Sequence, residues 1–187
     1  MQLAACASLS EFFREVLSSA MRNQGVEATS ATEFYLVNLL SHFTHLPVND
    51  EPLGLKLVDA QTRPPEERLQ ALRDVGDHSL YVSGLFADSL ERRNVDVDYY
   101  VQIGGSAYRQ LSQHNRYARD VQGTIFAELS DKFDRFVEVL AEVGVGSNLG
   151  SPTTLVSLYE RWLRTGSDWA ERRLREAGLV PRRGESQ

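Results

Sequence analysis

Residues 66–116 constrain the fold of this chain more than any other stretch, because apolar and small side chains recur there every three or four positions. This spacing predicts two helices joined by a short polar turn at residues 94–96, with Asp96 as the N-cap of the second helix. Gly104 and Gly105 fall in the middle of that second helix, where each costs about 1 kcal/mol relative to alanine. We therefore expect another backbone to approach this helix closely, so that tight packing offsets the loss.

The rest of the chain follows the same helical period. Capping-box patterns at residues 8–11 and 30–33 predict the starts of two helices. Residues 120–143 are typical of one amphipathic helix with a Glu128–Lys132 ion pair, and residues 168–177 of a last helix between Ser167 and Gly178 as caps. No segment alternates apolar and polar residues as a strand does. The sequence predicts an all-α, single-domain bundle of about seven to eight helices over residues 1–180, with a disordered tail at residues 181–187.

Bulk properties narrow the function classes. The 187 residues suffice for one buried core. The net charge of -6 counts against a protein that binds nucleic-acid backbones in general, since such affinity comes from clustered Lys and Arg. Cys6 is the only cysteine, which excludes an intrachain disulfide and fits a reducing compartment. No apolar run approaches the roughly eighteen residues of a membrane helix, so we expect a soluble, cytoplasmic protein without a membrane partner.

Asp74, Asp77 and His78 form the first candidate catalytic site. Asp74 and His78 lie four positions apart and share one helical face, so the carboxylate is able to orient the imidazole and raise its pKa. With a partner from another helix, this cluster would supply a general base or half of a metal site. An ordinary hydrogen-bond network, in which Arg73 pairs with Asp77, explains the same residues and is the favoured interpretation.

His42 and His45 are the candidate metal ligands, because their spacing near a helix end directs both rings to one side. Glu33, at the start of that helix, is assigned a capping role. None of the four histidines has Glu three positions before it, so the Glu-x-x-His pattern of di-iron bundles is missing. Structural packing is favoured over ligation here, and we expect no metal and no cofactor.

Tyrosines crowd residues 66–117: Tyr81, Tyr99, Tyr100, Tyr108 and Tyr117. Buried phenols need hydrogen-bond partners, so we expect some of them to meet Asp or His across the helix pair. Tyr100 and Tyr108 are the candidates for lining a ligand pocket, with ordinary core packing as the favoured alternative.

Arginines gather near the C-terminus, between Arg161 and Arg183, and Trp162 and Trp169 are interleaved with them. Basic and aromatic residues in this arrangement would suit nucleic acid or an acidic partner. Acidic neighbours dilute the positive charge, so we favour a solvated face of mixed charge and do not expect nucleic-acid binding.

Two functional hypotheses follow. The favoured one is a protein–protein interaction or scaffolding module, acting with a partner or as a homodimer. The small-residue helix at residues 97–111 is its expected close-packing surface, either within the chain or between molecules. The alternative is an enzyme or small-ligand-binding protein with a pocket in the bundle around the Asp–His pair. The sequence leans away from an enzyme, and it identifies no substrate, partner, pathway or oligomeric state.

Overall fold

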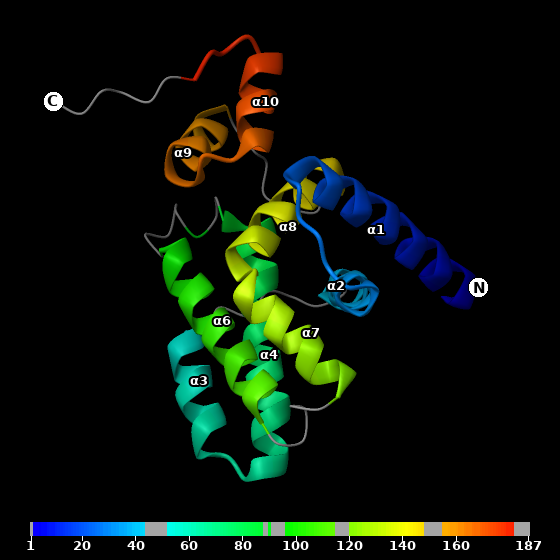
Figure 1. Cartoon of the computed structure of the whole chain (residues 1–187), viewed down its shortest axis with the longest axis vertical. Helices are drawn as coiled ribbons and strands as arrows, with labels where there is room; N and C mark the ends of the chain where they lie inside the picture. The colour runs from blue at the N-terminus through cyan, green and yellow to red at the C-terminus, as the bar shows by residue number, and fades with distance from the viewer. Residues whose placement is uncertain are drawn as a thin grey trace, which may run out of the picture.

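The computed structural model describes residues 2–43, 52–87, 90, 96–114, 120–147 and 155–181. Within these ranges the chain forms nine helices and no strand, which confirms the all-α prediction (Figure 1). The helices are α1 (Gln2–Gln24), α2 (Ser30–Phe43), α3 (Leu53–Thr62), α4 (Pro65–Leu85), α6 (Val97–Gln113), α7 (Val121–Asp131), α8 (Phe133–Ser147), α9 (Leu155–Thr165) and α10 (Asp168–Glu176).

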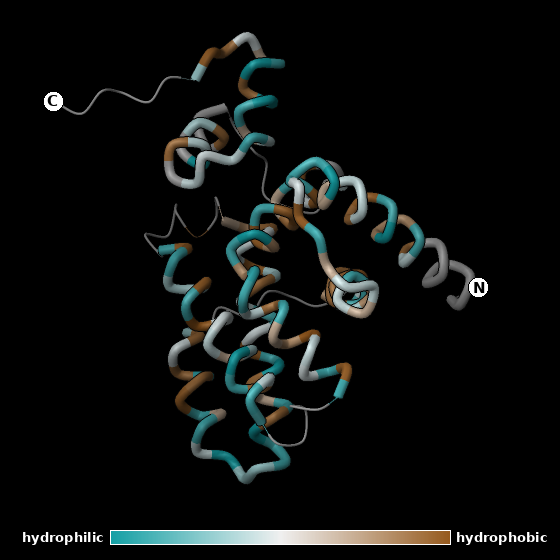
Figure 2. Tube along the Cα trace, in the orientation of Figure 1, coloured by the Kyte–Doolittle hydropathy of each residue, from teal (hydrophilic) through white to brown (hydrophobic). Residues whose placement is uncertain are grey.

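Helix α4 is the centre of the packing. It contacts α3, α6 and α8, and α6 in turn packs against α7, so that the two helices predicted from residues 66–116 lie side by side (Figure 1). Apolar and polar positions alternate around the helices, as their amphipathic spacing predicts (Figure 2). The large side chains that this arrangement buries completely include Phe13, Leu36, Leu80, Tyr108, Phe136 and Leu140.

Close packing explains Gly104 of α6. A Cβ atom on Gly104 would lie 2.4 Å from Cζ of Phe133 and 2.7 Å from Cβ of Ser79, closer than real Cβ contacts. Ser79 also donates a hydrogen bond of 2.5 Å to the carbonyl of Tyr100, which ties α4 to α6. The expected approach of another backbone is therefore wrong in detail: side chains of Phe133 and Ser79 approach Gly104, and the nearest contacts of a Cβ on Gly105 would be at 3.9 Å. Gly104 and Gly105 are buried within the chain, so this surface is used internally.

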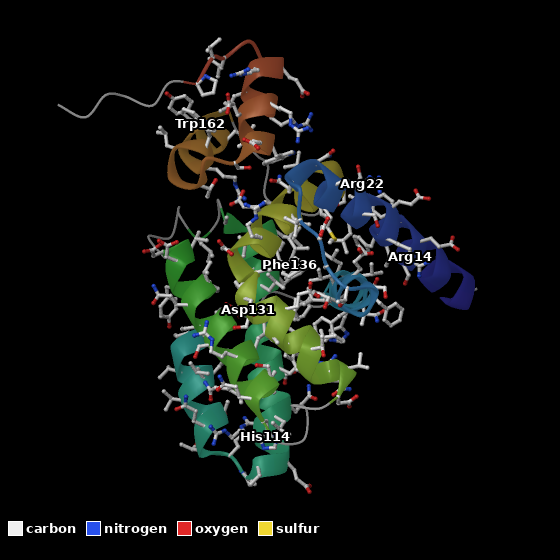
Figure 3. All side chains as sticks on the ribbon, in the orientation of Figure 1. Arg14, Arg22, His114, Asp131, Phe136 and Trp162 are labelled. Atoms are coloured by element: carbon white, nitrogen blue, oxygen red, sulfur yellow. The ribbon has the colours of Figure 1, made fainter. Side chains whose placement is uncertain are left out.

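Helices α9 and α10 enclose a second, smaller core. Its buried members are Leu158, Trp162, Trp169, Ala170 and Leu174, and Val145 of α8 packs against them. Figure 3 shows Trp162 in this outer pair of helices, whereas Phe136 lies in the main body. None of the helices in the described ranges is long and apolar enough to cross a membrane.

Several predicted helix boundaries are wrong. α1 begins at Gln2 rather than at residue 8, because the helical period continues through the alanine-rich segment before it. Thr29, not Ser30, caps α2: its hydroxyl accepts the amide hydrogen of Thr32 at 3.3 Å, and its carbonyl accepts that of Glu33 at 2.9 Å. Glu33 therefore lies in the first turn of α2 and does not complete a capping box with Ser30.

The predicted helix at residues 120–143 is two helices. The chain leaves helical geometry at Lys132, where φ is -114° and ψ is 23°, and α8 restarts at Phe133. The Glu128–Lys132 ion pair is nevertheless present at 3.0 Å and is confirmed. Asp96 and Ser167 occupy the predicted N-caps. The predicted C-cap of the last helix is wrong by one residue: Ala177 is the C-cap of α10, and Gly178 follows it with a φ of 82°. The predicted tail lies outside the described residues except for its first position, residue 181.

Candidate functional site

A cleft of about 840 Å³ lies between α2, α3 and α4, and each helix contributes one face to it. On α2 and α3 the contributing positions recur at helical spacing, which places them on one side of each helix, whereas α4 contributes most of the positions from 70 to 78. From α2 they are Tyr35, Asn38, Leu39, His42 and Phe43; from α3 and its C-cap, Lys56, Asp59 and Arg63; and from α4, Gln70, Ala71, Arg73, Asp74, Val75, Asp77 and His78. The volume is in the range of pockets that hold small organic molecules.

The wall of this cleft contains a carboxylate, Asp77, whose side chain is 16% exposed and which joins three helices. Tyr35 of α2 and Tyr108 of α6 both donate hydrogen bonds to its Oδ1, at 2.5 Å and 2.7 Å. Arg73 lies one turn earlier on α4, with its Nε 3.7 Å from Oδ2 of Asp77. The same Nε donates to the Tyr35 hydroxyl at 3.1 Å, and the guanidinium lies 5.0 Å from the centre of the Tyr35 ring. These four residues are the Asp77 cluster.

Burial controls the protonation of the Asp77 cluster. Burial raises the pKa of Asp77, and the hydrogen bonds from Tyr35 and Tyr108 and the charge of Arg73 oppose that rise. Burial, followed by the neighbouring Asp77 charge, also raises the pKa of both tyrosines well above the ordinary value of a phenol. The two phenols therefore stay protonated at neutral pH and act as donors to the carboxylate.

The structure brings Asp74 and His78 to the same cleft as Asp77. Asp74 accepts a hydrogen bond of 2.8 Å from the side-chain amide of Gln70. His78 is buried, and its ring centre lies 6.2 Å from that of Phe43. The three candidate catalytic residues are therefore adjacent in one wall, and the predicted pairing of Arg73 with Asp77 is confirmed.

The other candidates divide between the cleft and its surroundings. His42 lines the cleft, whereas His45 lies outside the described residues. Across the described ranges, no group of three or more His, Cys, Asp or Glu is placed to hold a metal ion. Tyr108 is fully buried, and its hydroxyl donates a hydrogen bond to Asp77. This confirms the expected contact between a tyrosine and an aspartate across the helix pair. Tyr100 is half-buried on α6 and contributes no wall to the cleft as the described residues define it.

Sequence reasoning did not identify Tyr35, Asn38, Lys56 or Asp59 as site residues. The signal was present in α2, where Tyr35, Asn38 and His42 recur at helical spacing between two apolar stripes. Their role depends on α3 lying opposite them across the cleft, and this placement is set by tertiary packing rather than by any local pattern.

In the arginine-rich C-terminal region, the side chains that the structure describes take part in contacts within the fold. Trp162 and Trp169 are buried in the second core, so neither ring is available to stack on bases. Arg161 is buried and lies 3.5 Å from Glu138, and Arg172 donates to the carbonyl of Asn23 at 3.1 Å. These arginines thus contribute to contacts between helices.

No protein-family model, no curated protein and no solved structure matches this chain.

Proposed function

We propose that this chain is a small-ligand-binding protein whose site is the cleft between α2, α3 and α4. The observation that carries the proposal is the cleft of about 840 Å³, whose wall combines Asp74, Asp77 and His78 with the apolar side chains of Leu39 and Val75. Sites for small molecules typically combine apolar walls with a few convergent polar groups.

The raised pKa of Asp77 supports the proposal that the Asp77 cluster does more than stabilise the fold. Because burial raises the pKa of Asp77, folding favours its protonated form, so its contribution to stability is greatest below its ordinary pKa and declines as the pH rises. Wherever Asp77 is ionised in the folded protein, its charge therefore costs stability. Carboxylates kept at such a cost in the wall of a cleft are typical of functional sites.

Binding is better supported than catalysis. Oδ1 of Asp77 already accepts two phenolic hydrogens, and Oδ2 lies 3.7 Å from Nε of Arg73, so the groups nearest to the carboxylate belong to the protein itself. A general base needs a free lone pair within hydrogen-bond reach of a substrate proton. The cluster thus serves to fix Tyr35 and Arg73 in the cleft wall, where they orient a ligand.

A fragment screen by ligand-observed NMR tests the proposal. Ala71 is partly exposed in the cleft, so Ala71→Trp fills the space with an indole ring. Gln122 is exposed on α7 and is no part of the cleft, so Gln122→Trp adds the same ring elsewhere and is the matched control. We expect fragments that bind the natural protein to bind Gln122→Trp equally and to lose binding to Ala71→Trp. Fragments that bind all three proteins alike would contradict the proposal.

A second candidate function is a protein–protein interaction module, with a partner protein or as a homodimer. It is favoured by α3, where Leu55 and Val58 are 63% and 59% exposed and lie on neighbouring turns of one face. Exposed apolar side chains grouped in this way are typical of contact surfaces. In either function we place the protein in the cytoplasm, because a single cysteine suits a reducing compartment.

Light scattering after size-exclusion chromatography separates the two functions. If α3 is a contact surface between copies, the natural protein is a dimer and Leu55→Glu is a monomer with unchanged fragment binding. A monomeric natural protein would count against self-association through α3 and would leave the cleft proposal as it stands.

A further inference from the structure

We propose that α9 and α10 form a docked arm, which opens from the body and unfolds before the body does. This inference does not depend on the proposed ligand site. It starts from the two cores: the arm encloses Trp162, Trp169 and Leu174, while the body has its own separate core of buried residues. Figure 1 shows α9 and α10 as a pair at one end of the molecule, next to α8 and the end of α1.

The contact between arm and body is loosely packed on both sides. A cavity of about 290 Å³ separates the turn at residues 165–168 from the body residues Val97, Val101 and Val137. A second cavity, of about 430 Å³, separates α10 at Trp169 and Arg172 from α1 and α8. Both cavities are open to solvent, so the side chains that line them bury less apolar surface on docking than those of a close-packed interface would.

Charged side chains make the main directional contacts across this interface. Arg161 of α9 lies 3.5 Å from Oε2 of Glu138 on α8, with their side chains only 9% and 16% exposed. Arg172 of α10 donates to the carbonyl of Asn23 in the last turn of α1, at 3.1 Å. A buried ion pair is costly to break one partner at a time, because the remaining charge is left without compensation. The pair therefore fixes the docked position of the arm.

An undocked arm would not persist as a folded unit. α9 and α10 contain 11 and 9 residues, and isolated helices shorter than about 12–15 residues are marginal in water. Opening would thus expose Trp162 and Trp169, and it would uncover the valines at the ends of α6 and α8. The arm is a conformational device that covers an apolar part of the body.

The two tryptophans make the inference testable, because they are the only ones in the chain and both lie in the arm. Urea unfolding of the full chain is followed by tryptophan emission, which reports the arm, and by far-UV circular dichroism, which reports mainly the body. We expect the tryptophan transition to have its midpoint at a lower urea concentration. Coincident transitions in the natural protein would overturn the inference.

Arg161→Met is the sharpest variant, and Arg175→Met is its control, because Arg175 pairs with Glu171 inside α10. We expect Arg161→Met to raise the open population on the order of tenfold or more, with a red-shifted emission and a body transition like that of the natural protein. Arg175→Met should change neither probe. If Arg161→Met shifts both transitions equally, the arm and body are one cooperative unit and the proposal fails. Hydrogen exchange on the natural protein is the independent check: amides of α9 and α10 should exchange faster than those of α4 and α8.

Discussion

Replacement of Gly104 or Gly105 by alanine gives opposite results although the two glycines are neighbours in α6. Both substitutions gain about 1 kcal/mol of helix propensity, because alanine loses less backbone entropy than glycine. At Gly105 the added Cβ meets its nearest atoms at 3.9 Å, an ordinary contact, so the gain is kept. At Gly104 the Cβ would lie 2.4 Å from Cζ of Phe133 and 2.7 Å from Cβ of Ser79.

Neither neighbour of Gly104 is able to move away cheaply. The Cβ of Ser79 is fixed by the backbone of α4, and Phe133 is buried against Tyr108, with ring centres 5.9 Å apart. Forcing a methyl group into such a core costs about 1–3 kcal/mol. Since the propensity gain cancels between the variants, Gly104→Ala should be less stable than Gly105→Ala by about that amount. Urea unfolding measured by circular dichroism checks the difference. Equal stabilities would refute the close approach of α4, α6 and α8 at Gly104.

Two further predictions concern pH. Burial raises the pKa of Glu128, but hydrogen bonds, among them those from Thr29 and Lys132, lower it by more than burial raises it. The net pKa is about 2, compared with the ordinary 4.5. This shift corresponds to at most about 3 kcal/mol of unfolding free energy. The stabilisation is present above pH 4.5 and is lost as the pH falls towards 2. In acid titrations, the stability difference between the natural protein and Glu128→Gln should therefore shrink over that range. Tyr108→Phe removes a donor from charged Asp77 and should cost about 1.5–3 kcal/mol at neutral pH, and less in acid. Tyr81→Phe is the control, because its hydroxyl meets a carbonyl at only 3.5 Å; equal losses for the two tyrosines would count against a charged Asp77.

The helical nature of the fold was predictable from local patterns, because apolar spacing and caps act within a few residues. Asp96 and Ser167 cap α6 and α10 as their sequence positions indicate. The break at Lys132 was not predictable in this way, because Glu128 and Lys132 have the spacing of an uninterrupted helix. There the chain turns so that α7 and α8 each contact α6, and that requirement comes from packing.

The part of the candidate site that lies on α4 was predictable from the sequence, and the part on other helices was not. Asp74, Asp77 and His78 were found because helical spacing places them near one another on a single helix. Tyr35 belongs to another helix, 42 residues before Asp77, and no local pattern joins positions so far apart. Phe34 illustrates the same limit in reverse: it stands three positions before the buried Val37, as in an apolar helical stripe, yet its side chain is 59% exposed. The face of α2 that turns inward is chosen by α1, α4 and α7, against which it packs.

The crystal structure of the protein soaked with fragments that pass the Ala71→Trp test is the most direct measurement of the central claim. We predict density for the fragment between α2, α3 and α4, within hydrogen-bond distance of Asp74 or His78, and with Tyr35 and Tyr108 still donating to Asp77. Fragments bound only elsewhere, with the side chains of α2 and α4 closed together over the site, would contradict the account.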